Sequence, residues 1–109
     1  WGKERITERE SKFNPIALKG APVLWRVVTR GTIGFDDPQV NPLLDPKLSS
    51  LGGSKVLVCV SELDLLRDRG EYYTNQLSKS GWRGVVELFE TKNKNHVFHL
   101  VKPPCDESV

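Results

Sequence analysis

The sequence predicts an α/β fold built on a parallel strand–helix–strand unit, and three consecutive segments of its second half predict it. Residues 55–60 (KVLVCV) are apolar after the lysine and rich in β-branched side chains, which is typical of a strand covered on both faces. Residues 65–80 follow a helical spacing, and residues 85–90 (VVELFE) have the composition of a second strand. Because strand, helix and strand follow one another, we expect the two strands to run parallel in one sheet.

The middle segment has both the spacing and the end signals of an amphipathic helix. Leu66, Tyr73 and Leu77 fall on one helical face. Lys79 lies in the expected last turn and Gly81 comes just after it, as at many helix C-termini.

The first half predicts a short helix. Pro22 is placed at its first helical position and Gly31 at its end. One face of this helix is apolar and needs a packing partner; its residues are Leu24, Trp25 and Val28.

The next segment, residues 35–53, is a predicted loop with turns, since three prolines interrupt it and two glycines end it. We therefore expect one partial domain, residues 1–109. It consists of a helix and loop segment, residues 1–54, and a βαβ unit, residues 55–109.

Composition argues against several classes of partner. Sixteen basic and 14 acidic residues give a net charge of +2 without a basic cluster, so nucleic-acid binding is not expected. Cys59 and Cys105 make no disulfide framework, and Cys59 lies in an apolar run where a buried thiol is common, so we expect a reducing, cytoplasmic location. No apolar stretch approaches the ~20 residues that span a bilayer, so we expect a soluble protein without a membrane partner.

The parallel topology brings two loops with polar side chains to one edge of the sheet. In a βαβ unit both strands end at the same edge, where open α/β sheets bind their ligands. Asp64 follows the first strand, and Asn93, Asn95 and His96 follow the second. A carboxylate facing an imidazole fixes the ring tautomer and stabilises the imidazolium, so Asp64 and His96 are the candidate catalytic pair. The alternative for Asp64 is a cap of the following helix.

The remaining polar residues near this edge have simpler interpretations. His99 is expected to pack or to form a hydrogen bond. Together with His96 it makes an H-x-x-H spacing, but zinc requires at least three protein ligands and only Cys105 lies nearby in sequence, so no metal site is predicted. Arg67 and Asp68 are expected on a solvated helix face or in a local ion pair, with a supporting role beneath the site as the alternative.

Four short motifs, in order along the chain, resemble one enzyme family. WGKE, DDPQVNP, SELDLLRDRGEYY and NHVFHL are similar to elements of the C-terminal part of plant carboxylesterases, in the hormone-sensitive-lipase branch of the α/β-hydrolases. The resemblance implies that Asp64, which opens D-x-L-R-D, is the triad acid and that His96, in H-x-F, is the general base. It also implies a small-molecule ester substrate and no cofactor.

The same resemblance identifies family motifs that this chain does not contain. The family carries a Gly-x-Ser-x-Gly elbow for the nucleophilic serine and a His-Gly-Gly oxyanion motif, and neither occurs here. Residues 52–56 (GGSKV) do not qualify, because they lack the closing glycine and precede a strand. The chain also starts at Trp1, contains no methionine and ends at PPCDESV, where the family continues. We expect a fragment, inactive alone.

Other roles on the same scaffold remain open. Gibberellin receptors resemble these esterases but have lost the triad histidine, and His96 argues against that role. A dehydratase of isoflavonoid metabolism would keep both the acid and the histidine. A non-catalytic remnant of a truncated gene is the third alternative.

Overall fold

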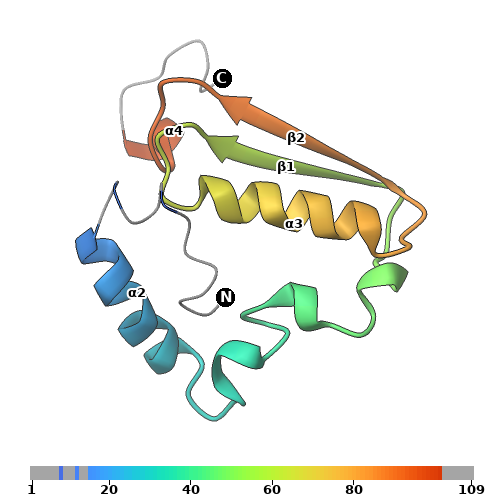
Figure 1. Ribbon diagram of the computed structural model, residues 1–109, viewed down its shortest axis with the longest axis horizontal. Coiled ribbons are helices and arrows are strands. Elements are labelled where there is room, and N and C mark those ends of the chain that lie inside the picture. Colours follow the sequence, from blue (N-terminus) through green and yellow to red (C-terminus); the bar gives the residue numbers. More distant parts are fainter. Residues whose placement is uncertain (1–7, 9–11, 13–14, 102–109) are drawn as a thin grey trace.

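Figure 1 shows the computed structural model, which describes residues 8, 12 and 15–101. The chain folds into the expected α/β arrangement, a parallel strand–helix–strand unit preceded by a helix and three short turns of 3₁₀ helix. In chain order the described elements are α2 (Pro15–Val28), η2 (Gly34–Asp36), η3 (Pro42–Leu44), η4 (Leu48–Ser50), β1 (Lys55–Ser61), α3 (Arg67–Lys79), β2 (Val85–Thr91) and α4 (Phe98–Val101).

The two strands pair in parallel along their whole length. Lys55 is opposite Val85 and Ser61 is opposite Thr91, so both strands end at the same edge of the sheet. That edge lies next to α4, at the left of Figure 1. The topology predicted from the sequence is therefore confirmed.

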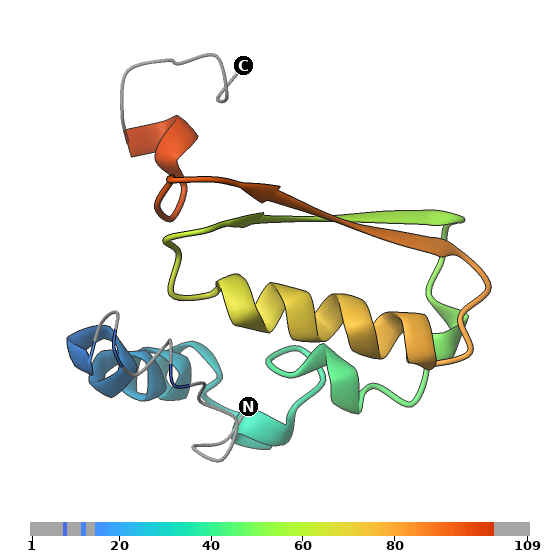
Figure 2. The same ribbon diagram turned by 45° about the horizontal axis from the view of Figure 1, so that its top comes forward.

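Helix α3 covers one face of the sheet, as Figures 1 and 2 show. Leu77 is fully buried between the helix and the strands, with 0% of its surface exposed. Gly70 lets the helix approach closely, because a Cβ atom at this position would lie 2.5 Å from Cγ1 of Val60. The helix ends in the predicted way, with Lys79 as its last residue and Gly81 at a positive φ of 85°.

The other face of the sheet is not covered by any described residue. Alternation turns Val56, Val58 and Val60 toward α3, and their neighbours in the strand toward the open face. Leu57 is 62% exposed there, and Cys59 is exposed too. Within the described residues, the expectations of a strand covered on both faces and of a buried Cys59 thiol are therefore wrong, because α3 is on one side only.

Helix α2 begins earlier than predicted. It starts at Pro15, which puts Pro22 inside the helix rather than at its first position. Proline there removes one backbone N–H donor, which makes an internal position less favourable than the first turn. The expected end is close to the observed one, since the chain turns after Val28 and Gly31 has a φ of 89°.

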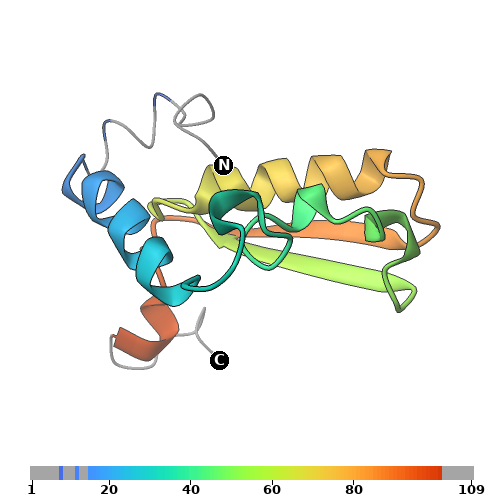
Figure 3. The same ribbon diagram turned by 90° about the horizontal axis from the view of Figure 1, so that it is seen from below.

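The apolar residues in the last two turns of α2, from Val23 to Val28, remain exposed, including Trp25 at 43%. The packing partner expected for this face is not among the described residues. In the views of Figures 2 and 3, α2 lies at the side of the unit rather than on the sheet. Within the described part of the chain, no helix is long and apolar enough to cross a membrane.

The predicted loop is a series of side-chain-stabilised turns. Asp37 organises the DDPQVNP motif, since its Oδ1 atom accepts the Gln39 amide at 2.8 Å and its carbonyl accepts the amides of Val40 and Asn41. Asp45 repeats the device with the amide of Lys47. This motif is thus a structural element that carries the chain to β1.

Candidate active site

The loops that follow β1 and β2 are joined by backbone hydrogen bonds. The amide of Glu62 donates to the carbonyl of Thr91, and the amide of Leu63 donates to the carbonyl of Lys94, each at 2.9 Å. The first bond continues the parallel pairing beyond β1, and the second crosses between the two loops. The polar segments expected to meet at this edge therefore do so.

Asp64 is held in place on both sides of its carboxylate. Its Oδ1 atom accepts the amide of Leu66, the N-cap residue of α3, at 2.8 Å, and its Oδ2 atom lies 2.7 Å from Nδ1 of His96. The residue is only 9% exposed. Asp64 does not cap α3, whose N-cap residue is Leu66 and has no side-chain cap. One carboxylate oxygen closes the turn that leads into the helix, and the other contacts the imidazole.

The ring of His96 is oriented by this contact. An ionised carboxylate only accepts hydrogen bonds, so Nδ1 is the protonated nitrogen and Nε2 has the lone pair that can take a proton. The His96 side chain is 56% exposed, so the ring is accessible from solvent. A histidine with one nitrogen fixed by a buried acid and the other accessible has the geometry that the acid and base of a nucleophilic triad require.

The loop that carries His96 contains two residues in the left-handed region. Asn93 has a φ of 55° and Val97 has a φ of 43°. Asparagine tolerates this conformation, whereas a β-branched valine there is strained. Between Asn93 and Val97, the amide of His96 donates a hydrogen bond to Oδ1 of Asn95 at 2.8 Å. Such strain persists only where surrounding contacts determine the backbone, and it clusters at functional sites.

Beneath the loops, charged side chains connect the start of α3 to the end of β2. Nε of Arg67 lies 2.6 Å from Glu90, and its Nη1 atom contacts Glu71 at 2.6 Å and Asp68 at 3.1 Å. Lys92 also pairs with Glu90. The expected local ion pair is present, between Arg67 and Asp68. The network also joins the start of α3, where the acid loop ends, to the end of β2, where the base loop begins.

These contacts shift the pKa values of the network. Lys92 and then Arg67 hold the pKa of Glu90 at about 2, below its ordinary 4.5. The hydrogen bond to Glu90 in turn raises the pKa of Lys92 and, with that of Asp68, the pKa of Arg67. Sequence reasoning missed Glu90, although strand alternation from Val86 would have turned it toward α3.

His99 has no contact with the candidate pair. It is exposed, and its ring meets that of Phe98 edge to face at 5.7 Å between centroids. Nζ of Lys94 lies over the Phe98 ring, 5.7 Å from its centroid. The packing interpretation of His99 agrees with this geometry. Among the described residues, no group of three or more His, Cys, Asp or Glu side chains is arranged to hold a metal ion, and Cys105 lies outside them.

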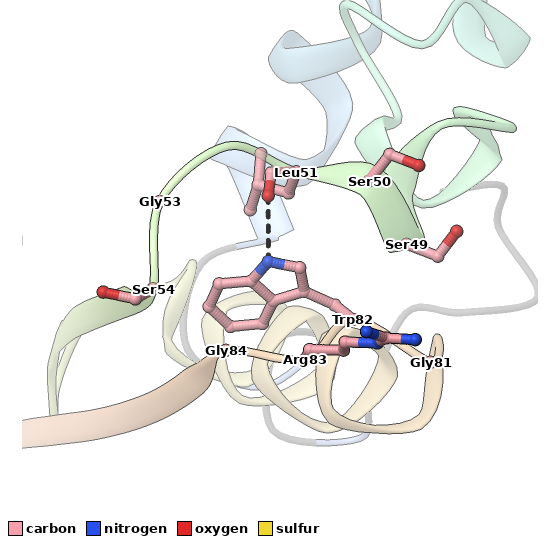
Figure 4. A pocket seen from close by; sticks show the side chains of 9 residues that line it. All are labelled: Ser49, Ser50, Leu51, Gly53, Ser54, Gly81, Trp82, Arg83 and Gly84. Carbon is pink, nitrogen blue, oxygen red and sulfur yellow. Dashed lines mark hydrogen bonds between the residues drawn. The ribbon is translucent and has the colours of Figure 1, made fainter.

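An open pocket of about 340 Å³ lies at the opposite edge of the sheet and is distinct from this site. Figure 4 shows its floor, where Nε1 of Trp82 donates to the carbonyl of Leu51 at 2.9 Å. Ser54, the serine of GGSKV, lines this pocket. It precedes β1, so it lies at the strand end opposite to Asp64 and His96 and cannot serve them as a nucleophile.

Comparison with known proteins connects the geometry to one family. The model of the alpha/beta hydrolase fold matches residues 3–100. Probable carboxylesterase 2 of Arabidopsis thaliana is 46% identical over 78% of this chain and 28% of its own length. Tuliposide A-converting enzyme b2, amyloplastic, of Tulipa gesneriana is 47% identical over 97% of this chain and 27% of its own length. Probable carboxylesterase 7 of Arabidopsis thaliana is 43% identical over 99% and 34%. The chain thus spans between 27% and 34% of the length of these relatives.

Proposed function

Because this chain belongs to the α/β-hydrolase fold family, we propose that it forms the part of a carboxylic ester hydrolase that supplies the acid and the base of a catalytic triad. The observation that carries the proposal is the 2.7 Å contact between Oδ2 of Asp64 and Nδ1 of His96. Relatives named as carboxylesterases are 46% and 43% identical to this chain over 78% and 99% of its length, which supports ester hydrolysis as the reaction.

In the proposed reaction, His96 moves the protons and Asp64 orients it. Nε2 of His96 takes the proton of a serine hydroxyl as the serine oxygen attacks the ester carbonyl, and the imidazolium then gives that proton to the departing alcohol. The same nitrogen next accepts a proton from water as the water oxygen attacks the acyl carbonyl. It gives that proton to the serine oxygen as the acyl–serine bond breaks and the carboxylic acid leaves. The chain contains no Gly-x-Ser-x-Gly motif, so the serine and the oxyanion donors belong to other segments of the protein in this proposal.

The proposal extends to partners and location. We take the substrate to be a small-molecule carboxylic ester, with neither nucleic acid nor a membrane as a partner. Too few cysteines for a disulfide framework support a reducing compartment, and we keep the cytoplasm as the proposed location. Some relatives are named as amyloplastic or mitochondrial proteins, so a fluorescent fusion of the complete protein is the measurement that decides.

A receptor role is less well supported than catalysis, because the histidine missing from gibberellin receptors is present and paired here. A dehydratase on the same scaffold uses the same acid and base. Assaying the purified complete protein with both a short-chain p-nitrophenyl ester and an isoflavanone substrate distinguishes the two reactions. Turnover of the ester alone supports the esterase.

The central test separates the two histidines in the complete protein that carries this chain. We expect His96→Ala to lower kcat for p-nitrophenyl acetate by roughly 10⁴- to 10⁶-fold, the range for loss of a triad member. His99→Ala is the matched control and should keep turnover near the wild-type value, because its ring contacts Phe98 rather than Asp64. Equal losses in two folded variants would exclude the proposed division of roles.

A second test concerns residues 1–109 alone. We expect no ester turnover above that of free imidazole, since no nucleophile faces Nε2 within the proposal. We also expect self-association in sedimentation, because Leu57 and Phe89 are 62% and 58% exposed on the open face of the sheet. A monomeric fragment with turnover that His96→Ala abolishes would contradict both expectations.

A further inference from the structure

We propose that Glu62 is a positioning residue that presents His96 to Asp64 by holding the turn at Asn93. The inference rests on the proposed function for its biological meaning, but its geometry stands on contacts that the triad chemistry does not use. Oε2 of Glu62 accepts the backbone amide of Asn93 at 2.8 Å, across 31 residues of sequence.

The position of Glu62 lets one residue tie the two loops twice. Its own amide donates to the carbonyl of Thr91, the last residue of β2, while its carboxylate accepts the amide two residues further along. The chain after β2 is therefore fixed to the acid loop both where the strand ends and where the loop begins to turn. Asp64 lies two residues after Glu62, so the same short segment carries the acid and the group that holds the base loop.

The turn that Glu62 holds lies in the same loop as a strained residue. Asn93 is in the left-handed region with a φ of 55°, which asparagine tolerates, and its amide donates to the acid loop. Val97, just after His96, is also left-handed with a φ of 43°, where a β-branched residue is strained. A strained residue next to the base needs contacts from its surroundings to keep the loop in place. A hydrogen bond from an amide to a carboxylate is among the stronger contacts available, because its acceptor is charged.

Other ties to this loop have different attachment points. The bond from the Leu63 amide reaches the carbonyl of Lys94, one residue after Asn93, and the bond between Asn95 and the His96 amide lies within the loop itself. Among the side-chain contacts above, only that of Glu62 links the acid loop to the turn ahead of His96. The pKa of Lys92 is raised mainly by its hydrogen bond to Glu90 and in part by the charge of Glu62.

The test reads the imidazole of His96 directly, so that it is independent of any esterase activity. The complete protein is labelled with ¹⁵N in histidine only, and the signals of His96 are assigned from their loss in His96→Gln. The wild type should show an Nδ1-protonated ring with a low-field proton resonance from the bond to Asp64. Glu62→Ala should lower the ratio of paired to unpaired His96 roughly tenfold, as expected from losing one charge-assisted hydrogen bond.

Three further variants make the test specific. Glu62→Gln keeps a carbonyl oxygen at the same reach and should restore most of the paired state, whereas Glu62→Asp keeps the charge but is one methylene too short and should not. Glu8→Ala is the matched control and should change nothing, since that glutamate pairs with Lys12 one helical turn further along the chain. If Glu62→Ala does not fold, the comparison of Glu62→Gln with Glu62→Asp tests the proposal, since only Glu62→Gln should keep most of the paired state.

Kinetics on the same proteins link the inference to catalysis. We expect Glu62→Ala to lower kcat roughly tenfold with KM unchanged, because the base is less often in place while the substrate pocket is not touched. Absence of ester turnover in the wild type, with the His96 signals behaving as expected, would reject the proposed function and leave the positioning role standing. A wild-type His96 signal in folded Glu62→Ala, or restoration by Asp rather than Gln, would overturn the positioning role itself.

Discussion

The two ends of the sheet are held by different kinds of contact. Where the strands begin, the Trp82 ring packs beneath Leu51 and is 9% exposed, and the Val85 amide donates to the carbonyl of Ser54. Where they end, the contacts are charged or polar, as in the pairs Arg67–Glu90 and Asp64–His96.

The difference shows how one small unit divides stability from orientation. Burial of an aromatic ring is non-directional and contributes a large free energy, so it suits an end that only has to be closed. Hydrogen bonds and ion pairs contribute little net stability but specify geometry, so they suit an end that has to present side chains. Gly84 reflects the first requirement, because a Cβ there would lie 2.1 Å from Cζ2 of Trp82.

Removing the Trp82 ring is the strongest way to break this comparison. We expect Trp82→Ala to lower the free energy of unfolding by about 3 kcal/mol, the lower part of the range for truncating a buried aromatic residue. Urea unfolding of the complete protein, followed by circular dichroism, measures the change.

Trp82→Phe is the matched control for that variant. It keeps an aromatic ring but removes the Nε1 donor to Leu51, so we expect a loss of only about 1 kcal/mol. A loss in Trp82→Phe as large as that in Trp82→Ala would show that the hydrogen bond, rather than burial, closes this end.

At the other end of the sheet, we expect Glu90 to make a smaller contribution to the free energy of unfolding, one that depends on pH. Its folded-state pKa of about 2 is below the ordinary 4.5, so the ionised form is favoured by folding. The resulting stabilisation is complete above pH 4.5 and is lost as the pH falls toward 2. The difference in free energy of unfolding between wild type and Glu90→Gln should therefore shrink over this interval. Denaturant unfolding at a series of pH values measures it.

Lys92→Ala separates the two partners of Glu90. The Lys92 side chain is 67% exposed, whereas that of Arg67 is 27% exposed, so solvent screens the lysine more and its removal should have the smaller effect on stability. If the free energy of unfolding of Glu90→Gln equals that of the wild type at every pH, the network does not stabilise this end of the strands.

Sequence reasoning recovered the candidate pair because it depended on topology rather than on detail. A parallel unit brings the ends of its strands together, so an acid after one strand and a histidine after the next had to be close. The prediction of where α2 begins was wrong, because two prolines could each have been the first residue of that helix. Pro22 is a good first helical residue, but Pro15 takes that place and the helix continues through Pro22.

The sequence alone determined the order of elements, the parallel direction of the strands and the edge where Asp64 and His96 meet, because periodicity and capping signals act between residues only a few positions apart. Only the tertiary structure decided that Cys59 is exposed, that Arg67 pairs with Glu90 across 23 residues, and that Glu62 accepts the Asn93 amide across 31. These contacts depend on the path of whole loops and on which face α3 covers. No spacing within one segment encodes them, since each is made by atoms that the fold brings together from separate elements.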